Sequence, residues 1–166
     1  MRYVMKQKIV SWGDDFVIRD ETGAERYFVD GRALSFGDKL SFKDMAGNEV
    51  AFIDQKLLAW GPTYEVFRDG RLFAVVKEKV WTFLRNKFNV DVGADGPGPG
   101  DLEVQGDFWD HEYEFEREGR VAARVSKRWF TWADTYGVEV AAGEDDVLIL
   151  VCAVVVDLCT QKERRD

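Results

Sequence analysis

The feature that most constrains this 166-residue chain is an uninterrupted run of ten apolar residues near its C-terminal end, at 147–156. No face of a helix drawn through this run would be polar. The segment must therefore be buried on all sides, either as a central strand or as a helix surrounded by protein. A helix needs roughly 20 apolar residues to cross a bilayer. The run is too short for that, and we expect no transmembrane segment.

The charged residues on either side of the run favour the helix. Acidic residues precede it and basic residues follow it, which suits the positive N-terminal and negative C-terminal ends of a helix. These residues are Glu144, Asp145 and Asp146 before the run, and Lys162, Arg164 and Arg165 after it. The many valines favour a strand instead. Because tertiary burial outweighs intrinsic propensity, we predict a helix from about residue 145 to 161, threaded through a sheet.

The rest of the chain has the pattern of short strands joined by tight turns. Alternating apolar and polar residues flank two turns that open with Asp and close with Gly, at 20–23 and 44–47. An Asp side chain accepts hydrogen bonds from nearby backbone amides, and Gly takes the left-handed conformation. Asp69-Gly70 and Glu118-Gly119 have the two-residue spacing of primed hairpin turns. The pattern predicts four β-hairpins.

A second repeat precedes several of these strands. An aromatic residue, a small residue, a turn residue and another aromatic residue recur at 11–16, 35–40, 131–136 and, more loosely, 59–64. We interpret the repeat as a corner, in which the aromatic anchors in the core, the small residue permits a bend and Asp binds backbone amides. The Asp residues of the repeat therefore have a structural rather than a catalytic role in this interpretation.

Composition indicates one folded domain over residues 1–166. A chain of this length buries about two thirds of its unfolded surface. Its 46% hydrophobic and 14% aromatic residues exclude a disordered chain. The Gly- and Pro-rich segment 93–100 is short enough for a hairpin tip rather than an interdomain linker. We predict a mostly β (α+β) domain built around the C-terminal helix.

Charge and cysteine usage constrain the partners and the compartment. The 23 basic and 31 acidic residues leave a net charge of -8, so the average field repels nucleic acid, and we expect no nucleic-acid partner. On one helix, Cys152 and Cys159 would be separated by roughly 10 Å of axial rise, beyond disulfide reach. Two unpaired thiols and an N-terminal segment without a secretory signal predict a cytoplasmic location.

The sole histidine, His111, restricts the chemistry available to this chain. Nucleophilic triads need a base of this kind, yet no G-x-S-x-G, Walker or dinucleotide motif accompanies it. A metal site formed with Asp107, Asp110 and Glu112 is disfavoured, because neighbouring positions of a strand point to opposite faces. A surface turn rich in acids is the simpler interpretation. We therefore predict no catalytic residues, no cofactor and no metal site.

With these elements in place, the chain resembles the LURP-one-related family, whose fold is similar to the tubby C-terminal and phospholipid scramblase domains. The residues that carry the resemblance are 5–9, 31–40, 55–58, 62–64, 126–130 and 134–136, together with the apolar segment that ends at Asp157. The resemblance covers nearly the whole chain. It implies a closed β-barrel of about a dozen strands around a buried hydrophobic helix, and it implies no particular reaction.

Several basic residues lie beside aromatic or apolar strand positions, and barrel closure would be needed to gather them. They are Lys6, Lys8, Lys56, Lys77, Lys79, Lys127 and Arg128. Tubby-like relatives bind phosphoinositide headgroups on the barrel surface, so the resemblance makes Lys56, Lys77 and Lys127 candidate ligands for an anionic headgroup. The alternative is that these are solvated charges that deter pairing between sheet edges.

The leading functional hypothesis is a non-enzymatic binding or scaffold domain of the LURP-one-related, tubby-like type. Its partner would be an anionic lipid headgroup or another protein. Two alternatives are a small-molecule hydrolase that uses surface carboxylates, and scramblase-like lipid handling. The hydrolase requires a deep polar pocket into which acidic side chains converge.

Overall fold

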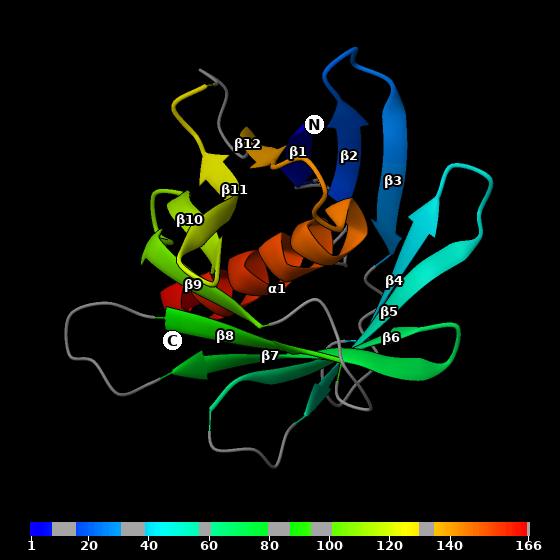
Figure 1. The fold of residues 1–166 in the computed structure, drawn as a ribbon. Helices are drawn as coiled ribbons and strands as arrows, with labels where there is room; N and C mark the ends of the chain where they lie inside the picture. Colours follow the sequence, from blue (N-terminus) through cyan, green and yellow to red (C-terminus); the bar gives the residue numbers. More distant parts are fainter. Residues whose placement is uncertain are drawn as a thin grey trace.

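A computed structural model describes residues 1–7, 16–30, 39–56, 61–79, 87–93, 101–129 and 135–165 of the chain. Within these ranges, antiparallel strands close into a barrel around one helix, α1 (Asp146–Arg165), as Figure 1 shows. The strands are β1 (Arg2–Gln7), β2 (Phe16–Asp20), β3 (Glu25–Asp30), β4 (Lys39–Asp44), β5 (Glu49–Lys56), β6 (Thr63–Arg68), β7 (Arg71–Lys79), β8 (Lys87–Val92), β9 (Leu102–Asp107), β10 (Glu112–Arg117), β11 (Arg120–Ser126) and β12 (Thr135–Val140). Each pairs with its neighbours in sequence, and β1 pairs with β12. The predicted mostly β barrel with a central C-terminal helix is confirmed.

The two turns that open with Asp have the predicted chemistry. Asp20 Oδ1 accepts hydrogen bonds from the amides of Thr22 and Ala24 at 2.9 and 3.1 Å, between β2 and β3. Asp44 makes the equivalent bonds between β4 and β5. Gly23 takes the left-handed conformation, with φ of 84°. Each Asp side chain therefore accepts hydrogen bonds from amide groups of its own turn.

The two-residue turns are also as predicted. Asp69 and Gly70 have φ of 48° and 72°, and Glu118 and Gly119 have φ of 50° and 73°. Two successive left-handed residues define the primed turn whose twist matches that of the flanking strands. They join β6 to β7 and β10 to β11. The predicted corner repeats lie largely outside the described residues, at 11–15, 35–38, 59–60 and 131–134, as do residues 94–100 of the Gly- and Pro-rich segment.

Helix α1 begins where the sequence predicted and ends later. Asp145 caps it, because its Oδ1 accepts a hydrogen bond from the Leu148 amide at 2.9 Å. The predicted end was at residue 161, but the helix continues to Arg165. The sequence beyond 161 contains no Gly or Pro to stop it, and Lys and Arg are good helix formers that suit its C-terminal end.

The helix fills the interior of the barrel. Every side chain from Leu148 to Val156 is at most 1% exposed, so all faces of this segment contact protein. Inward strand residues such as Tyr64 and Val66 complete the core, while the alternate residues of β6 point outward. The side chains of Cys152 and Cys159 are both buried, and burial raises the pKa of the Cys152 thiol. Among the described residues, no helix is long and apolar enough to cross a membrane.

Candidate functional site

The structure brings two of the three predicted lysines together and leaves the third apart. Lys56 on β5 and Lys77 on β7 both lie opposite Thr63 of β6, so they occupy one row across the sheet. Lys127 follows β11, which is separated from β7 by β8, β9 and β10. The three side chains do not form one site. Strand order and register decided this, and neither is visible in the local sequence.

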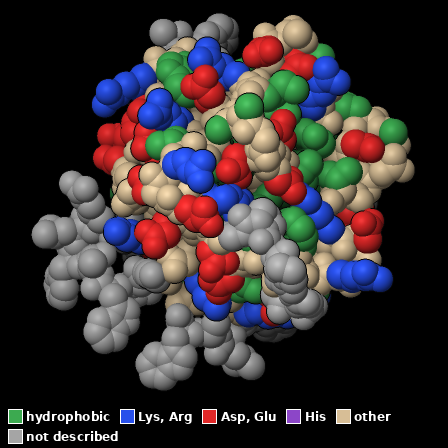
Figure 2. All heavy atoms as spheres, in the orientation of Figure 1, with side chains coloured by type: hydrophobic (Ala, Val, Ile, Leu, Met, Phe, Trp, Pro, Cys, Tyr) green, Lys and Arg blue, Asp and Glu red, His purple; other side chains and the backbone are tan. Residues whose placement is uncertain are grey.

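Lys56 and Lys77 already have acidic partners. The Lys56 ammonium lies 2.8 Å from Glu65 Oε2 and 3.4 Å from Asp54 Oδ2, and the hydrogen bond to Glu65 raises the pKa of Lys56. Lys77 lies 2.9 Å from Asp91 Oδ2. On the face drawn in Figure 2, basic side chains are interspersed with acidic ones rather than gathered in one patch. An anion that binds these two lysines would compete with their carboxylate partners for the ammonium groups. The role of the lysines in anion binding stays a prediction.

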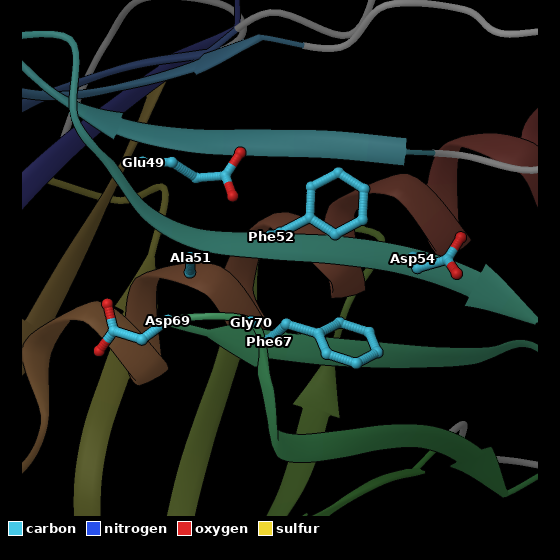
Figure 3. Close-up of a pocket in the computed structure, with 7 residues that line it drawn as sticks. All are labelled: Glu49, Ala51, Phe52, Asp54, Phe67, Asp69 and Gly70. Atoms are coloured by element: carbon cyan, nitrogen blue, oxygen red, sulfur yellow. The ribbon is translucent and has the colours of Figure 1, made fainter.

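A pocket of about 280 Å³ opens on the outer face of the sheet, between β5 and the turn that joins β6 to β7. Its walls include Phe52 and Phe67, which lie opposite each other in register, with ring centroids 6.4 Å apart. Both rings are half-buried and occupy outward positions, because their neighbours Ile53 and Val66 point into the core. In Figure 3 the two rings lie one above the other on neighbouring strands, and the central helix passes behind these strands. They form an aromatic surface accessible from outside.

Carboxylates surround this aromatic pair. Glu49, Asp54 and Asp69 line the pocket, and no Lys or Arg is among the described residues of its lining. In Figure 3 they lie around the rings and point in different directions, so they do not meet at one point. Catalysis by paired carboxylates needs two groups held on either side of one bond. The arrangement instead resembles an apolar pocket with an acidic rim, which suits a cation carried on an apolar stem.

A second polar cluster lies inside the barrel, near the C-terminal end of α1. His111 Nε2 is 2.7 Å from Asp157 Oδ1, and Gln161 donates a hydrogen bond to Asp157 Oδ2 at 2.7 Å. The His111 ring stacks on Tyr136, with centroids 4.6 Å apart. His111 belongs to the turn between β9 and β10 and has a left-handed φ of 53°. The turn therefore directs this imidazole inward, to a charged residue on the helix.

Sequence reasoning missed this cluster. It interpreted the region around His111 as a surface turn, whereas the imidazole is 14% exposed and Asp157 only 4%. The available signal was Asp157, a carboxylate that continues the apolar run, because a charged group in a buried segment requires a partner. Within the described ranges, no group of three or more His, Cys, Asp or Glu side chains lies close enough together to hold a metal ion.

Two phenols complete the internal cluster. The hydroxyls of Tyr113 and Tyr136 are buried, and burial together with the charge of Asp157 raises the pKa of both well above its ordinary value. Both therefore stay protonated hydrogen-bond donors. Neither hydroxyl has a partner among the described residues, and neither does His111 Nδ1.

Comparison with known proteins agrees with this architecture. The model of a protein family described as LURP-one-related matches residues 1–157. The uncharacterized protein YxjI of Bacillus subtilis (strain 168) is 35% identical over 154 residues, which cover 93% of this chain and 90% of the relative. The X-ray structure of a protein from Arabidopsis thaliana superposes with a TM-score of 0.68 at 20% identity, covering 94% of this chain and 90% of the other. The last comparison shows the shared fold.

Proposed function

Because this chain belongs to the LURP-one-related family, we propose that it is a non-enzymatic binding module that docks a basic segment of a protein partner on the outside of its barrel. The observation that carries the proposal is the pocket where Phe52 and Phe67 are surrounded by Glu49, Asp54 and Asp69. The relative at 35% identity is described as an uncharacterized protein, so the proposal rests on the pocket rather than on that relative.

The filled interior supports docking on the outside. Barrels that carry ligands inside keep an open lumen between their strands. Here α1 occupies that space, with Val151 and its neighbours on all faces of the helix buried. A partner segment therefore has the outer sheet face and the barrel ends available. The pocket between β5 and β6 lies on that outer face.

The chemistry of the pocket favours a Lys or Arg side chain as occupant. Its methylene stem would pack on the Phe52 and Phe67 rings while its charge approaches the carboxylates. A cation over an aromatic ring at an exposed site contributes about 0.5–1 kcal/mol, and an exposed ion pair contributes about 1 kcal/mol or less. Binding of one short segment is therefore weak, and several such contacts are needed to reach the roughly 4 kcal/mol that corresponds to a Kd of about 1 mM.

Anionic headgroup binding is the competing function. It would use Lys56, Lys77 and Lys127, of which the first two already pair with acidic residues. Among the described residues that line the pocket, the charged side chains are carboxylates, of which Asp54 also pairs with Lys56. Charge complementarity therefore favours a basic protein segment over a lipid headgroup.

Titration of isotopically labelled protein with two model peptides tests the proposal. One peptide alternates Lys and Ala, and the other alternates Glu and Ala. We expect the Lys peptide to shift backbone amide NMR signals of Phe52, Phe67 and Gly70, and the Glu peptide to leave them unchanged. Equal binding of both peptides, or shifts confined to other surfaces, would overturn the proposal.

A matched pair of variants sharpens the test. Glu49→Gln combined with Asp69→Asn removes two carboxylates from the pocket, and Asn tolerates the left-handed turn position. We expect binding of the Lys peptide to weaken by roughly fivefold, which is about 1 kcal/mol. Glu103→Gln removes an exposed carboxylate on β9, and this control should bind as the wild type does. Flotation with phosphatidylserine vesicles that is lost in Lys127→Ala would instead establish lipid recognition.

A further inference from the structure

The polar cluster at the C-terminal end of α1 has more hydrogen-bonding capacity than the protein itself satisfies. Within the described part of the chain, His111 Nδ1 and the hydroxyls of Tyr113 and Tyr136 are buried without a partner. Tyr113 and Tyr136 are only 3% and 2% exposed. Buried polar atoms are almost always paired with protein or ordered water, because leaving them unpaired is costly. His111 bonds Asp157 and stacks on Tyr136, and the charge of Asp157 acts on both phenols, so the three atoms belong to one cluster and point to a guest.

The chemistry of these atoms defines that guest. Asp157 accepts from His111 Nε2 and Gln161, which uses two of the roughly four lone-pair positions of a carboxylate. Nδ1 of the imidazole accepts a hydrogen bond in the neutral ring and donates one in the protonated ring. The two phenols are donors. A guest must therefore accept from the phenols and be able to bond Nδ1 in either role, and the charge of Asp157 disfavours an anion.

We propose that His111, Tyr113, Tyr136 and Asp157 form an internal water-binding site. Water is the smallest molecule that both donates and accepts, and a buried water typically makes about three hydrogen bonds. That number matches the three atoms that the protein leaves unpaired. The site joins the turn before β10, strands β10 and β12, and helix α1. Bound water thus becomes part of the contact that anchors the helix in the barrel.

Relaxation dispersion of ¹⁷O and ²H in solution detects long-lived internal water and tests the site. We expect a signal from wild-type protein that decreases in the Tyr113→Phe and Tyr136→Phe variants by about one water molecule. Tyr3→Phe is the matched control, because Tyr3 is also buried but its hydroxyl donates to Asp146. An unchanged signal in both cluster variants would overturn the proposal.

Two further measurements keep the test independent of variant folding. A crystal structure of the wild type at high resolution should show a density peak within about 3 Å of His111 Nδ1 and of a phenolic oxygen. The melting temperature also distinguishes the cases. Removal of a hydroxyl that binds water lowers the melting temperature. Removal of a hydroxyl that has no partner leaves the melting temperature unchanged or raises it. Absence of the density peak, or a raised melting temperature in both Phe variants, would contradict the site.

Discussion

The acidic residues at the start of the central helix and the acidic residue in its second half are stabilised in different ways. At the N-terminal end, Asp145 pairs with Arg68, Glu144 with Arg117 and Asp146 with Tyr3, and the three acidic side chains are partly exposed. These acids lie where the helix dipole already favours negative charge. Asp157 lies in the second half of the helix, about two turns before Arg165, where it is buried and outside the reach of the dipole at either end. Both sets of acids meet side chains from distant strands, but only the acids of the first turn are also favoured by the helix dipole.

Removal of the Asp157 carboxylate should have the largest effect. Asp157→Ala leaves His111 Nε2 buried without its acceptor, and a hydrogen bond to a charged group is worth about 1.5–3 kcal/mol. We expect the free energy of unfolding to fall by about 2–3 kcal/mol in urea denaturation at pH 7.

A double-mutant cycle isolates the Asp157–His111 contact from other effects of the substitution. His111→Ala, Asp157→Ala and the double variant should give a coupling of about 1–3 kcal/mol. Independent, additive effects would show that the contact at 2.7 Å contributes little to stability.

Arg68→Ala at the opposite end should cost less. The guanidinium contacts both carboxylate oxygens of Asp145 and lies 4.0 Å over the Phe73 ring, but both partners are partly exposed to solvent. We expect a loss of about 1–2 kcal/mol in the same denaturation experiment. Arg68→Lys should recover only part of it, because an ammonium cannot form the two parallel bonds. Full recovery would contradict the bidentate geometry.

The smallest effect we expect is the pH dependence contributed by Asp145. Burial alone would raise the pKa of this carboxyl, but hydrogen bonds from Arg68 and the Leu148 amide outweigh it and lower the pKa below 3.8. A lowered folded-state pKa means that the stabilisation is complete above pH 3.8 and is lost as the pH falls through the folded value. Melting temperatures measured from pH 6 to 2 should therefore decline less steeply in Asp145→Asn than in the wild type. Identical slopes would exclude this contribution.

The sequence alone predicted the elements whose causes are local. An apolar run between acidic and basic flanks specified a helix buried on all sides, and Asp-to-Gly turns specified hairpins, because helix ends and turns are decided by neighbouring residues. The closed barrel of about a dozen strands followed from the family resemblance rather than from these patterns. The C-terminal boundary of the helix was missed, since no residue beyond 161 acts as a stop signal.

The candidate sites were the least predictable part of the molecule. The pocket requires Phe52 and Phe67 to face each other across two strands, and the internal cluster joins His111 to Asp157, 46 positions away. The three lysines chosen from the sequence also divide by strand order, with Lys127 far from the other two. Hydrophobic burial and turn chemistry made the helix and the hairpins predictable from the sequence itself. Only the tertiary structure decided which polar groups meet, because register and barrel closure bring together residues that share no local pattern.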